Sequence, residues 1–145
     1  MMRTIFTIRR ITATLAFACC LVISGCGPSE TKVFPVTGSV TVNGKPAAGA
    51  QVIFHPVEGE TSGTRANAIV GTDGTYTLTT RAQGDGAPIG DYKVLVTLRE
   101  QIGLPDEGKT RSVLPEKYSK PELTPLTAKV VKGPNQIEPF VLSNR

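Results

Sequence analysis

Cysteine and histidine are almost absent from most of this sequence. All three cysteines lie within the first 26 of 145 residues, and His55 is the only histidine. A zinc or copper site needs several nitrogen or sulfur ligands, which residues 27–145 do not offer. A Ser-His-Asp triad would have to use His55, and no serine stands in a nucleophile-elbow motif. We therefore expect no metal, no cofactor and no catalytic residue, and a domain that folds without disulfides.

Long apolar runs are also missing, except near the N-terminus. Residues 11–24 (ITATLAFACCLVIS) follow a start that carries Arg3, Arg9 and Arg10 and no acidic residue. A cationic start, a short apolar segment and small residues at its end are the parts of a secretory signal. The segment is shorter than the roughly 20 residues that a transmembrane helix needs. We predict that residues 1–25 are a signal peptide, with a retained transmembrane anchor as the alternative.

The end of this segment, Ile23-Ser24-Gly25-Cys26, resembles the lipobox of bacterial lipoproteins. The resemblance implies that the Cys26 thiol receives a diacylglycerol, that cleavage precedes Cys26, and that the new amino group is acylated, for example with palmitate. Ser24 and Gly25 are small enough for extended backbone to pass through a narrow peptidase site. Residues 26–35 would then be the lipidated cysteine and a polar tether. The alternative is an ordinary secretory signal with an incidental thiol.

Removal of the signal changes the charge of the chain. The whole sequence has 16 basic and 12 acidic residues, a net charge of +4, and residues 1–25 hold three of the basic residues and none of the acidic ones. The 13 basic residues that remain nearly balance the 12 acidic ones, which leaves no concentrated basic face for nucleic acid. We expect attachment to a membrane through lipid, in the cell envelope at the outer membrane or facing the periplasm, and no nucleic-acid partner.

The remainder of the sequence has no sustained helical period. Residues 36–42 (VTGSVTV) alternate valine with threonine and serine, and Asn43-Gly44 after them is a strong signal for a hairpin turn. Further strand patterns occupy residues 49–56, 66–71, 75–80, 91–98, 127–131 and 136–142. About seven short strands at this spacing predict an all-β domain, a single antiparallel β-sandwich over residues 36–145.

The last two predicted strands carry topological information. We expect residues 127–131 and 136–142 to pair around Gly133-Pro134. Pro139 falls inside the final strand and cannot donate a hydrogen bond to a sheet ladder. The final strand is therefore predicted to lie at a sheet edge or to contain a bulge.

The segment VTGSVTVNGKPAAGAQVIFHP (residues 36–56) is similar to the opening of carboxypeptidase regulatory-like domains. TDGTYTL and GAPIGDYKVLV match later blocks of that family, and the tail from residue 114 to 142 looks like that of small lipoproteins abundant in planctomycete bacteria. The matched positions of the opening are Gly38, Val40, Gly44, Pro46, Gly49, Ala50, Val52 and Phe54. The resemblance implies a prealbumin-like (transthyretin-like) sandwich. It implies little about activity, because function resides in a site and not in a fold.

Other candidate residues have structural explanations. Asp73 and Asp85 are possible weak calcium ligands, but each stands beside a glycine, where aspartate is typical of a turn. Hydroxyisourate hydrolases of the transthyretin-like fold need several histidines and a Tyr-Arg-Gly-Ser ending, whereas this chain ends Leu-Ser-Asn-Arg. An intramolecular Lys-Asn isopeptide bond, which related surface modules form, would have to use Lys45 and Asn135, and both fall in predicted turns. We expect neither activity.

Residues 99–124 have no clear strand pattern, and an unstructured connection of this length is usually functional or mobile. Within it, Tyr118 stands beside Lys117 and near Lys120, bracketed by two prolines. These three residues could form an exposed recognition loop. Alternatively, Tyr118 packs against the edge of the sandwich, which we favour because a buried aromatic side chain commonly secures a long loop.

Together these observations predict a non-catalytic, lipid-anchored lipoprotein of the cell envelope. Its β-sandwich would bind an envelope protein, a peptide or a glycan, or act as a spacer. One alternative is an exported hydrolase with an unrecognised active site, against which the lack of a histidine cluster and of a nucleophile motif argues. The other alternative is an inert structural unit of the envelope.

Overall fold

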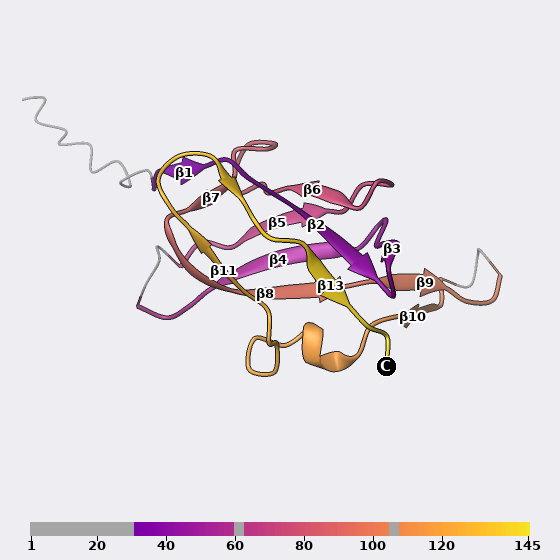
Figure 1. The fold of residues 1–145 in the computed structure, drawn as a ribbon. Helices are drawn as coiled ribbons and strands as arrows, with labels where there is room; N and C mark the ends of the chain where they lie inside the picture. Colours follow the sequence, from indigo (N-terminus) through magenta and orange to yellow (C-terminus); the bar gives the residue numbers. More distant parts are fainter. Residues whose placement is uncertain (1–30, 60–62, 105–107) are drawn as a thin grey trace, which may run out of the picture. The chain divides into compact units, whose positions relative to one another are not determined.

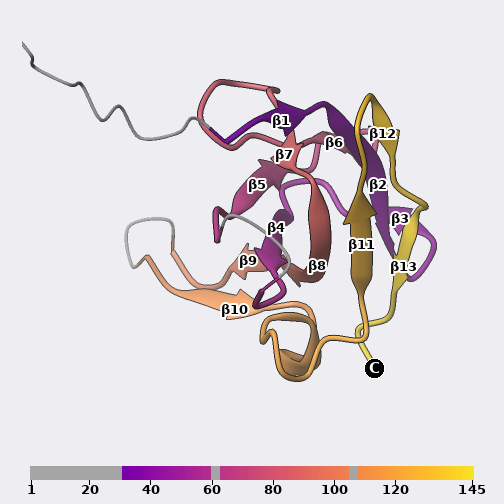
Figure 2. The same cartoon turned by 90° about the vertical axis from the view of Figure 1, so that its left-hand side faces the viewer.

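Two groups of β-strands lie against each other, as the two views in Figure 1 and Figure 2 show, and a hydrophobic core lies between them. The computed structural model describes residues 31–59, 63–104 and 108–145. The first sheet is antiparallel and has the order β11 (Thr127–Val130), β8 (Gly90–Thr97), β4 (Gln51–Pro56) and β5 (Ala66–Ile69). The predicted all-β sandwich is confirmed.

The second sheet is built around β2 (Val36–Val42). Its antiparallel neighbours are β3 (Lys45–Pro46) and β6 (Thr75–Thr77), and its parallel neighbours are β12 (Asn135–Gln136) and β13 (Phe140–Leu142). Two small pairs complete the strands: β1 (Val33–Phe34) with β7 (Ala87–Pro88), and β9 (Arg99–Gln101) with β10 (Thr110–Ser112). A short 3-10 helix, η2 (Glu116–Tyr118), follows β10.

Alternation along the strands accounts for most of the core. In β8, Tyr92, Val94 and Val96 are at most 1% exposed, while Asp91 and Lys93 on either side of Tyr92 are partly exposed; Leu95 is the exception, at 7%. This is the side-chain period of two that a half-buried strand imposes. The turn predicted at Asn43-Gly44 joins β2 to β3, and both residues have the positive φ, 51° and 78°, that such a turn requires.

The expected pairing of the two last strands is wrong. β11 pairs with β8 in the first sheet, whereas β12 and β13 pair with β2 in the second. The connection between them therefore crosses from one sheet to the other and is held by Asn135, whose Oδ1 accepts from the Val131 N–H at 2.9 Å and whose Nδ2 donates to the Gly133 carbonyl at 2.7 Å. The pairs with β2 are parallel, so the sandwich is not purely antiparallel.

Pro139 interrupts the final strand as predicted. It lies between β12 and β13, each of which pairs with β2 alone among the described strands. The final strand is thus an edge strand divided in two, because proline supplies no N–H for a continuous ladder.

Residues 99–124 contain more structure than the sequence pattern indicates. β9 and β10 pair as an antiparallel ribbon that extends from the end of β8 (Figure 1). All six residues of the two strands are exposed. An exposed ribbon does not need alternating apolar residues, so the sequence of these two strands has no strand pattern.

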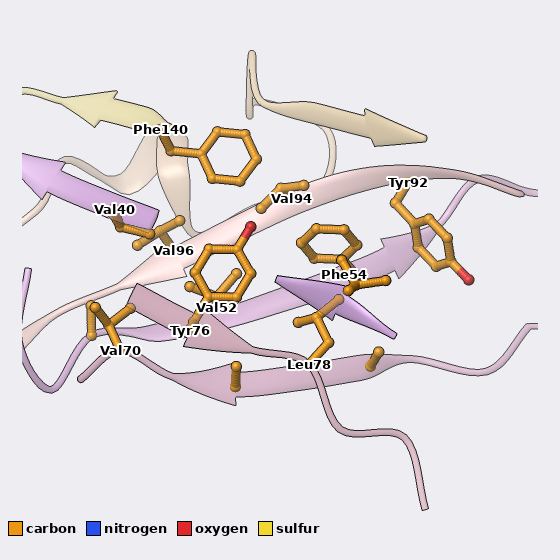
Figure 3. Close-up of a cluster of buried hydrophobic side chains, with 14 of the residues drawn as sticks. Val40, Val52, Phe54, Val70, Tyr76, Leu78, Tyr92, Val94, Val96 and Phe140 are labelled. Atoms are coloured by element: carbon orange, nitrogen blue, oxygen red, sulfur yellow. The ribbon is translucent and has the colours of Figure 1, made fainter. Parts of the chain in front are cut away.

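Three aromatic rings pack against one another in the centre of the core. Figure 3 shows Phe54 of β4 between Tyr76 of β6 and Tyr92 of β8, with ring centroids 6.5 Å and 5.5 Å away. The Tyr92 hydroxyl donates to the Pro88 carbonyl at 2.8 Å. The Tyr76 hydroxyl is buried and has no hydrogen-bond partner among the described residues.

The Tyr76 ring lies on Gly38 of the neighbouring strand β2. A Cβ at position 38 would be only 2.4 Å from the Tyr76 hydroxyl oxygen and 2.6 Å from Cζ. Position 38 therefore accommodates only glycine while this ring remains in place.

We predict opposite effects of removing the two hydroxyls. Tyr76→Phe should raise the free energy of unfolding at neutral pH by about 1 kcal/mol, because a buried, unpaired polar group is removed. Tyr92→Phe should lower it by about 1 kcal/mol through loss of the bond to Pro88. Urea unfolding of residues 31–145, which form one unit, measures both. A destabilised Tyr76→Phe variant would mean that its hydroxyl has a partner.

The same two variants have an expected pH dependence. Burial raises the pKa of Tyr76, and it raises that of Tyr92 to about 12. Unfolded tyrosines ionise near pH 10, so above about pH 10 the unfolded chain releases protons that the folded chain keeps, and stability falls as pH rises. Either substitution should reduce this alkaline loss of stability relative to the parent chain.

Candidate functional site

The predicted lipidation site lies outside the described residues. Cys26, with Ile23, Ser24 and Gly25 of the predicted lipobox, precedes Thr31, the first described residue. The structure nevertheless describes how the chain that follows them joins the domain. The relevant elements are β1, β7 and the loop at residues 80–86.

The chain is held to the sandwich earlier than the sequence indicates. The Thr31 carbonyl accepts from Nη2 of Arg81 at 3.0 Å, and in β1 Val33 and Phe34 lie opposite Pro88 and Ala87. The tether was expected to run to residue 35, but β1 already belongs to the folded unit. Two residues are too few to produce a strand pattern, so the sequence did not indicate this pairing.

Gly86 makes the approach of β1 possible. Its φ is +95°, and a Cβ at this position would lie 1.7 Å from the Phe34 carbonyl oxygen. The Gly86 N–H donates to the Leu78 carbonyl at 3.0 Å, and its own carbonyl accepts from Thr80 Oγ1 at 2.6 Å. Any other residue would have to displace either β1 or this loop.

Asp85 organises the same loop. Its Oδ1 accepts from the Thr80 N–H at 2.7 Å, and its Oδ2 accepts from the N–H groups of Arg81 and Ala82 at 3.0 Å each. Partial burial opposes ionisation, but these backbone hydrogen bonds outweigh it and lower the pKa of Asp85. The stabilisation is present when the carboxyl is ionised and is lost as the pH falls through the lowered pKa. The turn role predicted for Asp85 is confirmed.

Asp73 has a similar role between β5 and β6. Its Oδ1 accepts from the Thr75 N–H at 3.0 Å, and Thr75 Oγ1 also donates to it at 2.8 Å. The backbone hydrogen bond from Thr75 is the main reason why the pKa of Asp73 is lowered. This is the turn chemistry expected of aspartate before glycine.

Tyr118 of the possible recognition loop packs into the domain, as the favoured interpretation predicted. Tyr118 is 7% exposed and belongs to the hydrophobic core together with Leu114. Nearby, Thr124 is buried and its Oγ1 donates to the Val94 carbonyl of β8 at 2.7 Å. The segment between β10 and β11 therefore packs against the edge of β8, and Tyr118 is not an exposed recognition tip.

The two lysines of this loop remain on the surface. Lys117 Nζ lies 5.0 Å from the centre of the Tyr118 ring, a cation–π contact at an exposed position. Lys120 Nζ forms an ion pair with Glu116 at 2.7 Å. The hydrogen bond and the charge of Glu116 raise the pKa of Lys120. Lys117 thus lies over the Tyr118 ring, whereas Lys120 is paired with Glu116, so the two lysines have different partners.

His55 is part of an interaction that the sequence did not indicate. Its Nδ1 lies 3.1 Å from the Pro56 carbonyl, and its Nε2 lies 3.0 Å from Nη2 of Arg65. A carbonyl and a guanidinium on opposite sides assign the proton to Nδ1 and leave Nε2 as the acceptor. Because Arg65 lies ten residues away in the following loop, only the folded chain reveals the pair.

The described part of the chain contains neither a cluster of metal-ligating side chains nor a membrane-spanning helix. Within residues 31–59, 63–104 and 108–145, no three histidine, cysteine, aspartate or glutamate side chains are grouped so as to hold a metal ion. Nor does this part of the chain have a helix with the length and hydropathy to cross a membrane.

Comparisons with known proteins give two distant structural likenesses. No family model and no curated protein matches the sequence. A 9R-lipoxygenase from Cyanothece PCC8801 is 11% identical with a TM-score of 0.42, over 77% of this chain and 16% of the lipoxygenase. A DUF3823 family protein from Parabacteroides merdae is 16% identical with a TM-score of 0.37, over 79% of this chain and 46% of its own. At these scores neither likeness carries a functional argument.

We predict that Gly86→Ala releases β1 from the sandwich. The Cβ would overlap the Phe34 carbonyl, so hydrogen exchange at residues 33 and 34 should become fast, as measured by mass spectrometry. Gly84→Ala is the matched control, because position 84 also has positive φ, 73°, but its Cβ would contact only Thr77 Cγ2 at 3.6 Å. Equal exchange in the two variants would contradict the role of Gly86.

Proposed function

We propose that this chain is an exported lipoprotein, acylated at Cys26, that presents a non-catalytic β-sandwich in the cell envelope. The observation that carries the proposal is the lipobox-like Ile23–Cys26 at the end of a secretory signal, with no other cysteine in the mature chain. The described domain supports it, because the folded unit begins at Thr31, only five residues after Cys26, and β1 follows directly at Val33. An acyl group at Cys26 would therefore hold the sandwich next to a membrane.

The hydrogen bonds of the polar residues support a non-catalytic role. Both ring nitrogens of His55 have partners, Asp73 and Asp85 each accept hydrogen bonds within their own turns, and the Asn135 amide holds the crossover between the sheets. A catalytic group needs to contact substrate, and these groups are occupied by contacts that shape the fold. We therefore infer a module that binds an envelope protein, a peptide or a glycan, or that serves as a spacer.

We also propose that the domain is a member of the carboxypeptidase regulatory-like family. Positions of the family pattern have a structural reason in this chain: Gly44 and Gly49 have φ of 78° and 79°, and Val40, Val52 and Phe54 are fully buried. Glycine and apolar residues are what these backbone angles and this core require. The relation to planctomycete lipoproteins belongs to the same proposal.

The lipid anchor is tested by mass spectrometry of the N-terminal peptide, combined with crosslinking in living cells. We expect an acylated peptide that begins at Cys26 and a crosslinked partner that is lost in a Cys26→Ser variant. Cys20→Ser is the matched control, because Cys20 lies in the segment that would be removed, so its peptide and partner should be unchanged. An unacylated N-terminus would overturn the proposal, whereas an acylated chain without a partner would favour the spacer.

The hydrolase alternative has its own test. We expect the purified mature chain to show no turnover of generic ester and glycoside substrates above a buffer control. His55→Ala separates the two readings, because it removes the only histidine and leaves Arg65 without its ring acceptor. Turnover by the parent chain that disappears in this variant would show that the protein is an enzyme.

A further inference from the structure

The end of the sandwich where the chain enters carries an unusual surface. The pairing of β1 with β7 ends at Val33 opposite Pro88, and that of β11 with β8 ends at Val130 opposite Gly90. The next residues outward in each pair are Lys32, Ile89 and Val131, and Lys132 follows Val131. We call these four residues the tether-end patch. Figure 1 shows β1, β7 and β11 at one end of the sandwich and the β9–β10 ribbon at the other.

The tether-end patch combines exposed apolar and basic side chains. Ile89 is 49% exposed and Val131 is 51% exposed, although both continue strands whose neighbouring residues are buried. Lys32 and Lys132 are exposed. This combination matches the boundary between lipid headgroups and acyl chains. There, apolar side chains are buried among the acyl chains, and lysines contact the phosphates of the headgroups.

The charges beside the patch do not oppose this contact. The nearest acidic group on β8, Asp91, forms an ion pair with Lys129 of β11 at 3.1 Å. Arg81, whose guanidinium donates to the Thr31 carbonyl, lies in the same loop as Asp85, which accepts from the Arg81 N–H, so these two opposite charges offset each other. The positive charge of the surface around the entry point therefore comes from Lys32 and Lys132, and this is the sign that anionic headgroups attract.

Chain length places this surface near the anchor. Five peptide steps separate Cys26 from Thr31, so the two Cα atoms are at most about 18 Å apart. An acyl group at Cys26 would therefore keep Lys32 and the rest of the tether-end patch close to the bilayer surface. Of the possible occupants, a bilayer is the one that the chain itself brings to this end of the sandwich.

We propose that the tether-end patch rests on the membrane, with Ile89 and Val131 in the interfacial layer and Lys32 and Lys132 at anionic phosphates. This inference depends on the proposed acylation of Cys26 and adds a second, non-covalent contact that orients the domain. The β9–β10 ribbon then points away from the bilayer.

The test uses the full acylated chain, in which an introduced cysteine is the only unmodified thiol. An environment-sensitive fluorophore is attached in an Ile89→Cys variant, and the protein is reconstituted in vesicles of phosphatidylcholine, alone or with equal parts of phosphatidylglycerol. We expect the emission to shift to shorter wavelength, more strongly with phosphatidylglycerol. Val141→Cys is the matched control, because Val141 is 74% exposed but lies opposite Thr41, near the far end of β2, and its dye should not respond.

Charge reversal separates the patch from the anchor. Lys32→Glu combined with Lys132→Glu should abolish the extra shift in phosphatidylglycerol vesicles, while flotation of the protein with vesicles persists because the acyl chains remain. Lys45→Glu with Lys117→Glu, two exposed lysines elsewhere, should leave the shift unchanged.

Each other outcome contradicts a specific part of the proposal. An N-terminal peptide without acyl groups overturns the anchor and the patch together. An acylated chain whose dye at position 89 behaves like that at position 141 overturns the patch alone. A shift that depends on protein density at fixed lipid composition would assign the patch to a second copy of the chain instead.

Discussion

The contact of Phe54 with Tyr76 connects the two sheets on which the whole domain depends. Phe54 comes from β4 of the first sheet and Tyr76 from β6 of the second, and their rings meet edge to face. No cysteine follows residue 26, so the sheets remain together through such buried contacts and through the backbone hydrogen bonds between Asn67 of β5 and Thr79 after β6. Gly38 lies under the Tyr76 ring because no larger residue fits, and the tyrosine hydroxyl is buried without a hydrogen-bond partner among the described residues. At Tyr76, close packing of the ring is thus achieved without a hydrogen bond for the hydroxyl.

The sequence predicted the parts of the fold that depend on local alternation. β4 and β8 have buried residues at alternate positions, β2 has buried valines at 36 and 40 with Gly38 between them, and the Asn43-Gly44 turn needs only positive φ at two residues. The partners of β12 and β13 were not predictable in this way. A crossover between sheets and a hairpin have the same turn residues, and the difference depends on which sheet has an edge for the returning strand.

The candidate site residues also divide into those with local contacts, which the sequence indicates, and those with long-range contacts, which it does not. The turn roles of Asp73 and Asp85 are local, so their neighbours in sequence were sufficient to indicate them. The burial of Tyr118 required only that a long loop be secured by an aromatic side chain. In contrast, the pair of His55 with Arg65 and the contact of Gly86 with Phe34 join separate segments, and no spacing in the sequence encodes them.

The parallel pairing of β2 with the last strands has a consequence for the order of folding. The Asn135 N–H donates to the Pro35 carbonyl, and the Asn43 N–H donates to the Leu142 carbonyl, so the central strand is completed by residues about a hundred positions later. Contacts of such long range raise the contact order and slow folding. The second sheet therefore cannot close until the C-terminal strand has emerged from the ribosome, which delays folding of the domain to the end of its synthesis.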